Sequence, residues 1–546
     1  MMKRSNSIVS TMKDSQGIPR RQILRFSTVA PVAILLPRWL TALGATPSTF
    51  DYYISTTGSD SNAGSLSSPW AITSLMVKNA NFYKMAGKRI GLLPGTYNVG
   101  AYVYPDSSTG AIQIPGGSSG APTYIASCDS SGNYSPRTAT ITALVSGVYG
   151  GHAGHTYNGP IISHVGKFPA TYPVGYMTMD GLIISGFSYK AVRIGGGSSG
   201  DGPTGLRGIV VQNCEFTGGS SNPGDATDNA VSLWLDNTIG AVVTNNYFHD
   251  NYAFSTTSMD HLNAVILWEC QGTTIQYNTA VNAGNIYGKE VGNQGSTVQY
   301  NYVDASMYTA RGTASGIEDF TGANTSGLTQ TTTIRNNIVI SSGWGIQGAT
   351  LSYNYGWTTP VNIYNNTIVL KPTASPYPAA WVTSQSSRNI KFYNNIYAGA
   401  ADGSGYKAFH LNPDGPSVWD YNLYIGSGMT WALSNDTLLS AVLSSFTSQS
   451  AVAAAVTAAG GIAGLDAHSI ATNSPGFIGA GLLAQNYQLA SSSPAKNSGR
   501  SDGTTGGSAC DMGAWGNGAT QIGCSFAGGS SGSNTVTPMA PSLNVL

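Results

Sequence analysis

Short apolar runs that end in an Asn-containing corner recur through the middle of this chain, and this repetition constrains the fold more than any other feature. The clearest stretch is 230–337, where AVSLWLD…VVTNNYFHDN, AVILWE…TIQYNTAVN and NIYGKE…TVQYNYVD are followed by a looser SGIEDF…TTIRNNIVIS. The corner residues that we align are Asp180, Asn213, Asn246, Asn278, Asn301, Asn337, Asn366, Asn395 and Asn422. They recur every 23 to 36 residues, a shorter and less regular period than the roughly 40–50 residues of a β-propeller blade. The repeat therefore predicts a parallel β-helix.

The residues around each corner agree with this all-β fold. Apolar side chains alternate with others, as at Ile209 and Val211, which is the period of a half-buried strand. Asn tolerates a left-handed backbone, and its amide can bond the Asn of the next coil. We expect a stack with an Asn ladder along one corner and caps on its open ends.

The regions outside the repeat form the ends of this stack. Strand-like runs at 52–55 and 90–93 flank a helix that we expect to begin at Ser68 and Pro69, since Ser is a common N-cap and Pro a common first residue. The predicted organisation is an N-terminal cap and first coil at 46–100, a β-helix with a catalytic groove at 101–435, a helix-containing insertion and closing coils at 436–524, and a disordered Gly/Ser tail at 525–546.

Motifs at both ends carry a family resemblance. The start, YYIS…TGSD…PGTY, and the closing series GLDAHS, SPGF, YQL, SPAK and DMGAW resemble secreted right-handed parallel β-helix proteins of the pectate-lyase-like superfamily. The resemblance spans about 50–516 and implies polysaccharide lyase or glycoside hydrolase chemistry. It does not decide the reaction, because that superfamily also includes epimerases and non-catalytic adhesins.

The first 45 residues have the features of a targeting segment. Paired arginines at 20–21 precede an apolar run at 26–36 and the small-residue site ALGA at 42–45. The run is shorter than the ~20 residues of a membrane span. This order is typical of a twin-arginine-type signal peptide. We predict export to the periplasm or beyond, without stable membrane association.

Charge and cysteine content exclude some partners and frameworks. The formal net charge is zero, so we expect no bulk binding of nucleic acid. Five cysteines are an odd number, which argues against a complete disulfide framework. Cys510 and Cys524 could pair, whereas Cys214 fits a buried small apolar position.

Stacked coils also predict where a site would lie. Equivalent strands lie about 4.8 Å apart, so equivalent side chains form columns across the coils. Aligning the first strands places Trp234, Trp268 and Lys289 in one column and Ser232, Ile266 and Tyr287 in the next. Indole faces beside polar groups suit a sugar ring, so the substrate-binding candidates are Trp234, Trp268, Tyr287, Asp260 and His261. Buried core stacking is the alternative for the two tryptophans, and local loop hydrogen bonds are the alternative for Asp260 and His261.

Lys289 leads the first catalytic hypothesis. Its segment NIYGKEVGNQGSTVQYN resembles the lysine-bearing coil of β-helix polysaccharide lyases, including the alginate and chondroitin types, in which the lysine is the base. The resemblance implies that Arg311 assists it. β-Elimination on a uronate needs such a base and a cation that stabilises the developing charge. A surface salt bridge of Lys289 is the alternative.

Acidic residues around the repeat support two other interpretations. The catalytic candidates are Glu269, Glu290, Glu318 and Asp319, which could act in pairs as general acid and base of a glycoside hydrolase. Asp228 and Asp236 are candidate calcium ligands, since calcium takes carboxylate oxygens and could bridge an anionic substrate. Three functions stay open: a polysaccharide lyase, a glycoside hydrolase, and a non-catalytic glycan-binding surface protein.

Overall fold

The computed structural model describes most of the region from 49 onward. Described are 49–100, 111–145, 148–149, 160–164, 175–187, 190–195, 205–219, 230–251, 262–286, 295–305, 316–319, 330–341, 346–348, 361–370, 378–382, 390–399, 407–411, 416–426, 430–433, 444–473, 476–479, 484–500, 510–515 and 519–525. All of these residues belong to one compact unit, Thr46–Leu546.

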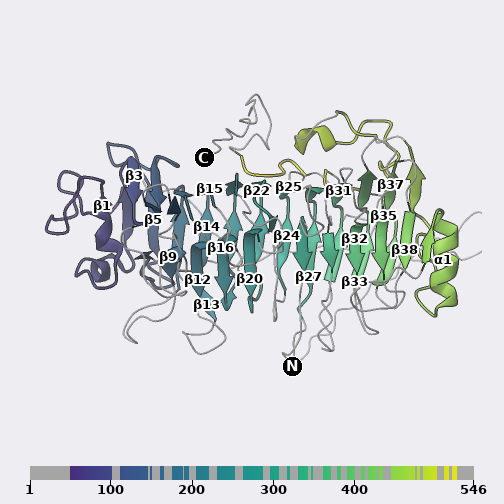
Figure 1. Ribbon diagram of the computed structural model, residues 1–546, viewed down its shortest axis with the longest axis horizontal. Coiled ribbons are helices and arrows are strands. Elements are labelled where there is room, and N and C mark those ends of the chain that lie inside the picture. The colour runs from purple at the N-terminus through teal and green to yellow at the C-terminus, as the bar shows by residue number, and fades with distance from the viewer. Residues whose placement is uncertain are drawn as a thin grey trace, which may run out of the picture. The chain divides into compact units, whose positions relative to one another are not determined.

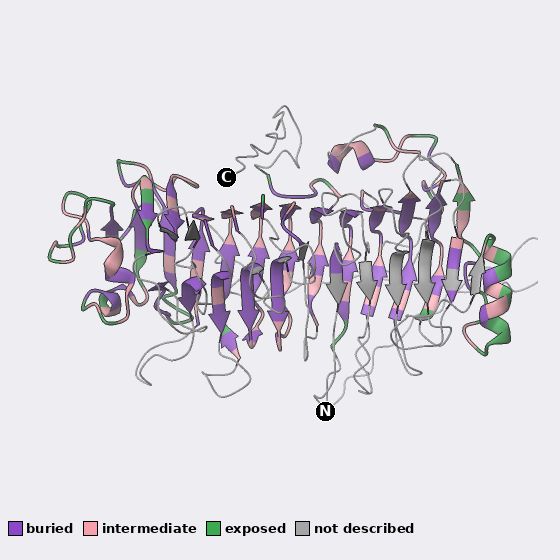
Figure 2. Cartoon of the chain, viewed as in Figure 1, coloured by how far each residue is buried: buried purple, intermediate pink, exposed green. Residues whose placement is uncertain are grey.

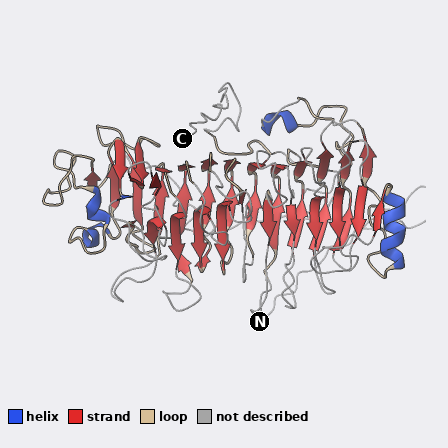
Figure 3. Cartoon of the chain, in the orientation of Figure 1, coloured by secondary structure: helices blue, strands red, loops and turns tan. Residues whose placement is uncertain are grey.

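Three sheets of twelve strands make up most of this unit, and each complete coil, from β2–β4 to β36–β38, contributes one strand to each sheet (Figures 1 and 3). The first sheet consists of β1 (Tyr52–Ile54), β2 (Arg89–Leu92), β5 (Thr123–Ser127), β10 (Met177–Asp180), β14 (Ile209–Gln212), β18 (Val242–Thr244), β21 (Thr274–Gln276), β24 (Thr297–Gln299), β27 (Thr332–Arg335), β30 (Val361–Tyr364), β33 (Ile390–Tyr393) and β36 (Pro416–Asp420). The second consists of β3 (Gly95–Asn98), β6 (Ala139–Thr142), β11 (Ile183–Ser185), β15 (Glu215–Thr217), β19 (Tyr247–His249), β22 (Thr279–Val281), β25 (Tyr302–Ala305), β28 (Ile338–Ser341), β31 (Thr367–Leu370), β34 (Ile396–Gly399), β37 (Leu423–Ile425) and β40 (Ile470–Thr472). The third consists of β4 (Ile112–Gln113), β9 (Pro160–His164), β12 (Lys190–Gly195), β16 (Ala230–Asp236), β20 (Leu262–Trp268), β23 (Asn285–Ile286), β26 (Ile317–Asp319), β29 (Ile346–Gly348), β32 (Pro378–Val382), β35 (Lys407–Leu411), β38 (Thr430–Leu433) and β39 (Ser444–Phe446).

The pairing of these strands confirms the predicted parallel β-helix. Within the three sheets every described pair is parallel except β38 with β39, which is antiparallel. Two small sheets complete the strands, β7 (Leu144–Val145) with β8 (Val148–Tyr149) and β13 (Leu206–Arg207) with β17 (Thr238–Ile239). The only α-helix among the described residues is α1 (Gln449–Ala458), and three short 3-10 helices are η2 (Ile72–Leu75), η3 (Phe82–Met85) and η5 (Ala484–Tyr487).

The core lies inside the coils and is built from stacked apolar columns. One column of the third sheet runs through Ile162, Val192, Leu233, Val265, Ile286 and Ile317. Burying each such side chain contributes roughly 1.5–3 kcal/mol. Figure 2 shows buried residues along the strands and exposed residues on the outer side of α1. Each coil places an apolar side chain at the same inward position, and burial of these side chains against one another therefore drives the coils to stack.

A ladder of seven asparagines follows one corner of the stack, between the first and second sheets. It runs through Asn246, Asn278, Asn301, Asn337, Asn366, Asn395 and Asn422, all buried. Each side-chain oxygen accepts from the backbone N–H of the ladder residue before it, and ladder amides also bond one another at 3.0–3.2 Å. The predicted role of these amides is confirmed.

Two of the aligned corner residues, Asp180 and Asn213, occupy other positions. The strand register places Asp180 opposite Gln212, and Asn213 takes the left-handed backbone with a φ of 55°. The ladder position in the coil of Asn213 is Cys214, whose N–H donates to Asn246. The alignment was therefore two residues early at Asp180 and one early at Asn213. In the ladder coils the left-handed residue precedes the ladder Asn, as Asn245 and Asn336 do, so the two roles belong to neighbouring residues.

The carboxylate of Asp180 nevertheless has hydrogen-bond donors around it at this position. Its carboxylate is fully buried and accepts hydrogen bonds from Tyr124, Tyr134, Gln212 and Asn213 at 2.5–2.7 Å. Four donors around one buried carboxylate offset its loss of hydration. This cluster joins the coils before the ladder begins.

The caps differ from the prediction in detail. The helix expected from Ser68 and Pro69 is the 3-10 helix η2, whose N-cap residue is Ala71 and has no side-chain capping bond. Trp70 and Phe82 are buried against the first coils. At the other end α1 packs Val452 and Val456 into the same core, and Figure 1 shows it beside β38.

A C-terminal strap, here the described residues between 484 and 525, runs back along the ladder corner and the outer face of the second sheet. Corner side chains of successive coils bond its backbone: Asn394 donates to Arg500, Asn365 to Asp511 and Asn336 to Ala514. The strap ends where the N–H of Ser525 donates to Asn245 at 2.6 Å. Its apolar residues cover β25, β28 and β34, so this outer face is closed by the chain itself.

The five cysteines are free and buried. The suggested pair is not formed, because Cys510 lies beside Asn394 whereas Cys524 lies beside Thr279, several coils away. Cys214 is a core residue, as predicted. No helix within the described ranges is long and apolar enough to cross a membrane.

Candidate functional site

The strand register corrects the predicted columns on the third sheet. Trp234 of β16 lies opposite Ile266 of β20, and Trp268 lies opposite Asp236. The sequence alignment had matched the two tryptophans and was therefore wrong by two residues. Their rings still meet, with centroids 6.1 Å apart and planes at 20°, because diagonal neighbours on a sheet lie within reach of large aromatic side chains. Ser232 lies in the coil interior, where it accepts a hydrogen bond from Asn251.

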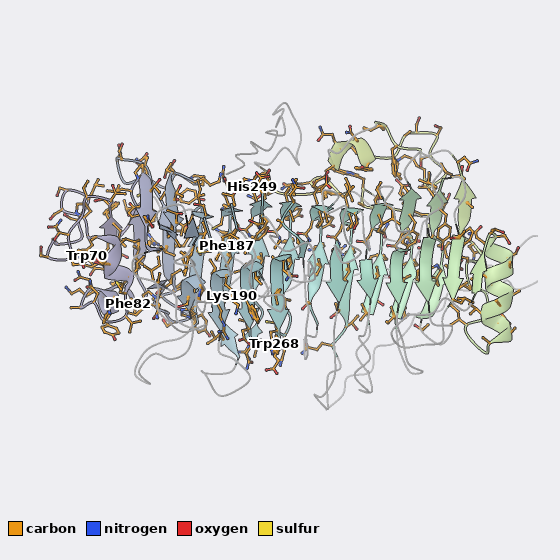
Figure 4. All side chains as sticks on the ribbon, viewed as in Figure 1. Trp70, Phe82, Phe187, Lys190, His249 and Trp268 are labelled. Atoms are coloured by element: carbon orange, nitrogen blue, oxygen red, sulfur yellow. The ribbon has the colours of Figure 1, made fainter. Side chains whose placement is uncertain are left out.

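A local break in the alternation brings two cations to the same outward face. Ala191 and Val192 of β12 both enter the core, so Lys190 and Arg193 on either side of them both lie outside. Lys190 Nζ is 3.8 Å and Arg193 Cζ is 5.8 Å from the centroid of the Trp234 ring. Figure 4 shows Lys190 on β12 and Trp268 at the end of β20.

Trp234 faces outward but is closed on both sides. Lys190 comes from the coil before it and Trp268 from the coil after it. Only 9% of Trp234 is exposed. Trp268, the other tryptophan predicted to stack on a sugar, is half-buried and therefore less covered than Trp234. The alternative that Trp234 and Trp268 belong to the coil interior is also wrong, since with Val231 and Ile266 they form a separate cluster outside it.

Asp236 lies beside this aromatic pair as a buried acid. Its Oδ2 accepts from the Arg193 guanidinium at 3.1 Å. Burial raises the pKa of Asp236 to about 6, although the charge of Arg193 and its hydrogen bond oppose the shift, and Glu269 adds to it. Asp236 is therefore partly protonated in mildly acidic solution.

Three polar atoms of this face are buried and have no hydrogen-bond partner among the residues that the structure describes. They are Asp236 Oδ1, Trp234 Nε1 and Asn263 Nδ2. A buried polar group without a partner costs about 1–3 kcal/mol. Three such atoms on two successive coils of one face mark it as a candidate site for a polar ligand. We call Lys190, Arg193, Trp234, Asp236, Asn263, Trp268 and Glu269 the outward site.

Calcium does not fit Asp236 in this arrangement. One carboxylate oxygen is already paired with a guanidinium, which is the neutralisation that a bound cation would supply. No group of three His, Cys, Asp or Glu side chains in the described ranges could hold a metal ion. Asp228, the other candidate ligand, lies outside those ranges.

The remaining predicted site residues are described only in part. Glu269 follows β20, is half-buried and has a left-handed backbone with a φ of 50°. Glu318 and Asp319 belong to β26, where their backbones pair with Gln347 and Gly348. Those outside the described residues are Tyr287, Lys289, Glu290, Arg311, Asp260 and His261.

Lys190 and Arg193 were missed by the sequence analysis. They precede the clear repeat by one coil, and they are three residues apart, which strict alternation would place on opposite faces. Two bases in the six residues of KAVRIG were the available signal, since only 9% of the chain is charged.

A second polar cluster lies on the outer side of the second sheet. His249 bonds Glu215 at 3.2 Å through Nε2 and Asp250 at 2.8 Å through Nδ1. Burial alone would lower its pKa, but these two carboxylates raise the pKa of His249 to about 8. Tyr247 stacks on the imidazole, with centroids 4.1 Å apart. This arrangement ties β15 to β19 and is fully paired, so we interpret it as structural.

Comparisons with known proteins show similarity in structure only. No family model matches the sequence, and no curated protein matches it. The pectate lyase Pel9A is 16% identical, with 85% of this chain and 95% of that chain covered and a TM-score of 0.41. A rhamnogalacturonan lyase is 15% identical, with 67% and 86% covered and a TM-score of 0.40. The GH136 lacto-N-biosidase from Eubacterium ramulus is 12% identical, with 68% and 63% covered and a TM-score of 0.40. These similarities assign no activity, and the fold rests on the strand pairing described above.

Proposed function

We propose that this protein is an exported enzyme that binds a uronate-containing polysaccharide at the outward site and cleaves it by β-elimination. The observation that carries the proposal is the outward site itself, where an indole, two cations and an acid meet on one face, and one oxygen of the acid has no partner among the described residues. A sugar ring presents an apolar C–H face and a polar edge, and this combination of groups complements both.

The charges favour an acidic sugar. Lys190 and Arg193 place two positive charges on this face, opposed by Asp236 and Glu269. When Asp236 is protonated, the cations outnumber the remaining carboxylate. A uronate would then be attracted to the face, and Trp268 would stack on its ring.

Elimination also needs a base and a group that stabilises the developing negative charge. For these roles we retain Lys289 and Arg311, which the sequence suggests and which lie outside the described residues. The base removes the proton on the carbon beside the carboxylate, and the cation stabilises the charge as it develops.

A glycoside hydrolase is the second candidate, and one observation favours it. Asp236 has a raised pKa, and the carboxylate of Glu269 is close enough to contribute to the shift. Acid–base hydrolysis requires a carboxyl group that can hold a proton beside a second carboxyl group.

Product chemistry separates these functions. The purified protein is incubated with uronate polymers and neutral polysaccharides, each with and without calcium. Ultraviolet absorbance of an unsaturated uronate is expected and identifies a lyase. New reducing ends without that absorbance identify a hydrolase and overturn the elimination. Binding without any product identifies a glycan-binding surface protein, and loss of activity on chelation would indicate that the reaction needs calcium.

Two variants test the assigned parts. Lys289→Ala is expected to abolish elimination, and unchanged activity would remove Lys289 from the mechanism. Replacing Arg20 and Arg21 by Lys is expected to keep the protein in the cytoplasm with its N-terminal segment attached; unchanged export and processing would argue against the twin-arginine route.

A further inference from the structure

We propose that Asp236 is the residue that protonates the glycosidic oxygen of the departing sugar, and that Arg193 is a positioning residue that holds the resulting carboxylate. This inference rests on the proposed function and adds to it a proton donor that the sequence had suggested only as a calcium ligand.

The geometry separates the two oxygens of Asp236. Oδ2 is fixed by Arg193 at 3.1 Å, so the carboxyl group cannot rotate freely. Oδ1 is buried and has no partner within the described part of the chain. The side chain therefore has one anchored oxygen and one buried oxygen for which the described residues supply no partner, and only 2% of the residue is exposed.

Neighbouring groups would hold a sugar beside Asp236. Trp268 lies directly opposite Asp236 on the next strand and is the half-buried aromatic face of the outward site. Trp234, two residues before Asp236, contributes an indole N–H that also has no described partner. A sugar stacked on Trp268 would thus meet an acid and a hydrogen-bond donor from one strand.

The proton transfer balances within the elimination. The base takes the proton beside the carboxylate, and the electron pair of that C–H bond forms the ring double bond. The bond from the adjacent ring carbon to the glycosidic oxygen breaks, and its electron pair stays on the oxygen. That oxygen takes the proton from Oδ1, and Asp236 becomes a carboxylate that Arg193 already contacts. In hydrolysis the same protonation would assist departure, with water supplying the nucleophile.

Leaving-group dependence is the test, because only a poor leaving group needs an acid. Wild type and Asp236→Asn are compared on the natural polymer and on a synthetic substrate whose leaving group is an aryl oxygen. On the polymer we expect kcat of Asp236→Asn to fall by about 10²–10⁴-fold. On the aryl substrate we expect a change of less than about tenfold, because that leaving group departs without a proton. Equal losses on both substrates, or no loss on either, would overturn the assignment.

Controls separate folding, binding and chemistry. Asp304→Asn changes a buried carboxyl on the second sheet and should leave both rates unchanged. Trp234→Phe removes the indole N–H and reduces the aromatic surface, and it should raise KM more than it lowers kcat. If Asp236→Asn does not fold, the pH dependence of kcat of the wild type provides the test. On the polymer kcat should fall above pH about 6, where Asp236 loses its proton. On the aryl substrate kcat should not fall there. Identical pH profiles for the two substrates would refute the role of Asp236.

Inactivity of the wild type has a separate meaning. If the folded wild type cleaves no polysaccharide, the proposed function fails. If it cleaves a polymer and Asp236→Asn shows no leaving-group dependence, the proposed function stands and only the assignment of Asp236 fails.

Discussion

Removing one amide from the middle of the Asn ladder should destabilise the whole protein. Asn301 is fully buried, and its Oδ1 accepts from the backbone N–H of Asn278 at 2.9 Å and from the Asn278 amide at 3.0 Å. Its Nδ2 donates to the carbonyl of Ile275 and to Oδ1 of Asn337, both at 3.0 Å. The change Asn301→Ala removes four hydrogen bonds at once.

The expected loss follows from what remains buried. The Asn278 N–H loses its partner in the ladder, and the Ile275 carbonyl and Asn337 Oδ1 each lose a donor. A buried group left unsatisfied costs about 1–3 kcal/mol, so the free energy of unfolding should fall by roughly 3–6 kcal/mol. That is a large part of the ~5–15 kcal/mol that stabilises a typical domain.

Urea unfolding followed by circular dichroism measures this change, with Gln299→Ala as the control. Gln299 lies two residues earlier in the same coil, is half-buried and bonds Gln276 outside the core. It should cost less than about 1 kcal/mol. A loss for Asn301→Ala as small as that for Gln299→Ala would refute the claim that the ladder stabilises the stack.

Other predictions concern pH, strain and binding. Burial lowers the pKa of His164 from 6.5 to about 4, so between these pH values the unfolded chain binds a proton that the native protein excludes. The free energy of unfolding should therefore fall by up to about 3 kcal/mol as the pH drops from 6.5 to 4. In His164→Gln the urea midpoint should no longer depend on pH in this range. His249 has a raised pKa of about 8, so its contribution is present below pH 6.5 and is lost as the pH rises through about 8; an unchanged alkaline slope in His249→Gln would contradict this. Gly195→Ala should destabilise by about 2–5 kcal/mol in the same assay, because φ is 120° and a Cβ would strike the backbone carbonyl of Asp236. Trp268→Ala should raise KM for the polymer about tenfold while changing kcat less; an unchanged KM would exclude stacking there.

The fold was predictable because every coil repeats the same requirements. The seven corner asparagines and the alternating apolar runs can be recognised directly in the sequence, because the backbone geometry of each coil requires both. Asp180 and Asn213 were misaligned because one corner contains three neighbouring positions with different demands, and Asn can satisfy two of them. The sequence does not show which of the two a given Asn occupies.

The site was less predictable because it depends on register. Trp234 and Trp268 look equivalent in sequence, but the pairing of β16 with β20 separates them by two residues. Lys190 and Arg193 share a face only because Ala191 and Val192 both turn inward. This break in the alternation cannot be recognised in the hydrophobic pattern of the sequence, because Ala191 and Val192 are both apolar.

The strap makes the number of coils a fixed property of this chain. Stacked repeats are in principle open-ended, and a coil could be gained or lost without altering its neighbours. Here Arg500, Asp511 and Ala514 meet three successive coils, and Ser525 reaches Asn245, which lies 280 residues earlier. If a coil were deleted, the strap residues beyond that point would no longer lie opposite the corner side chains that they now contact. The strap therefore fits a stack with only one number of coils. Among relatives of this protein the loops between strands should vary, while the number of coils stays constant.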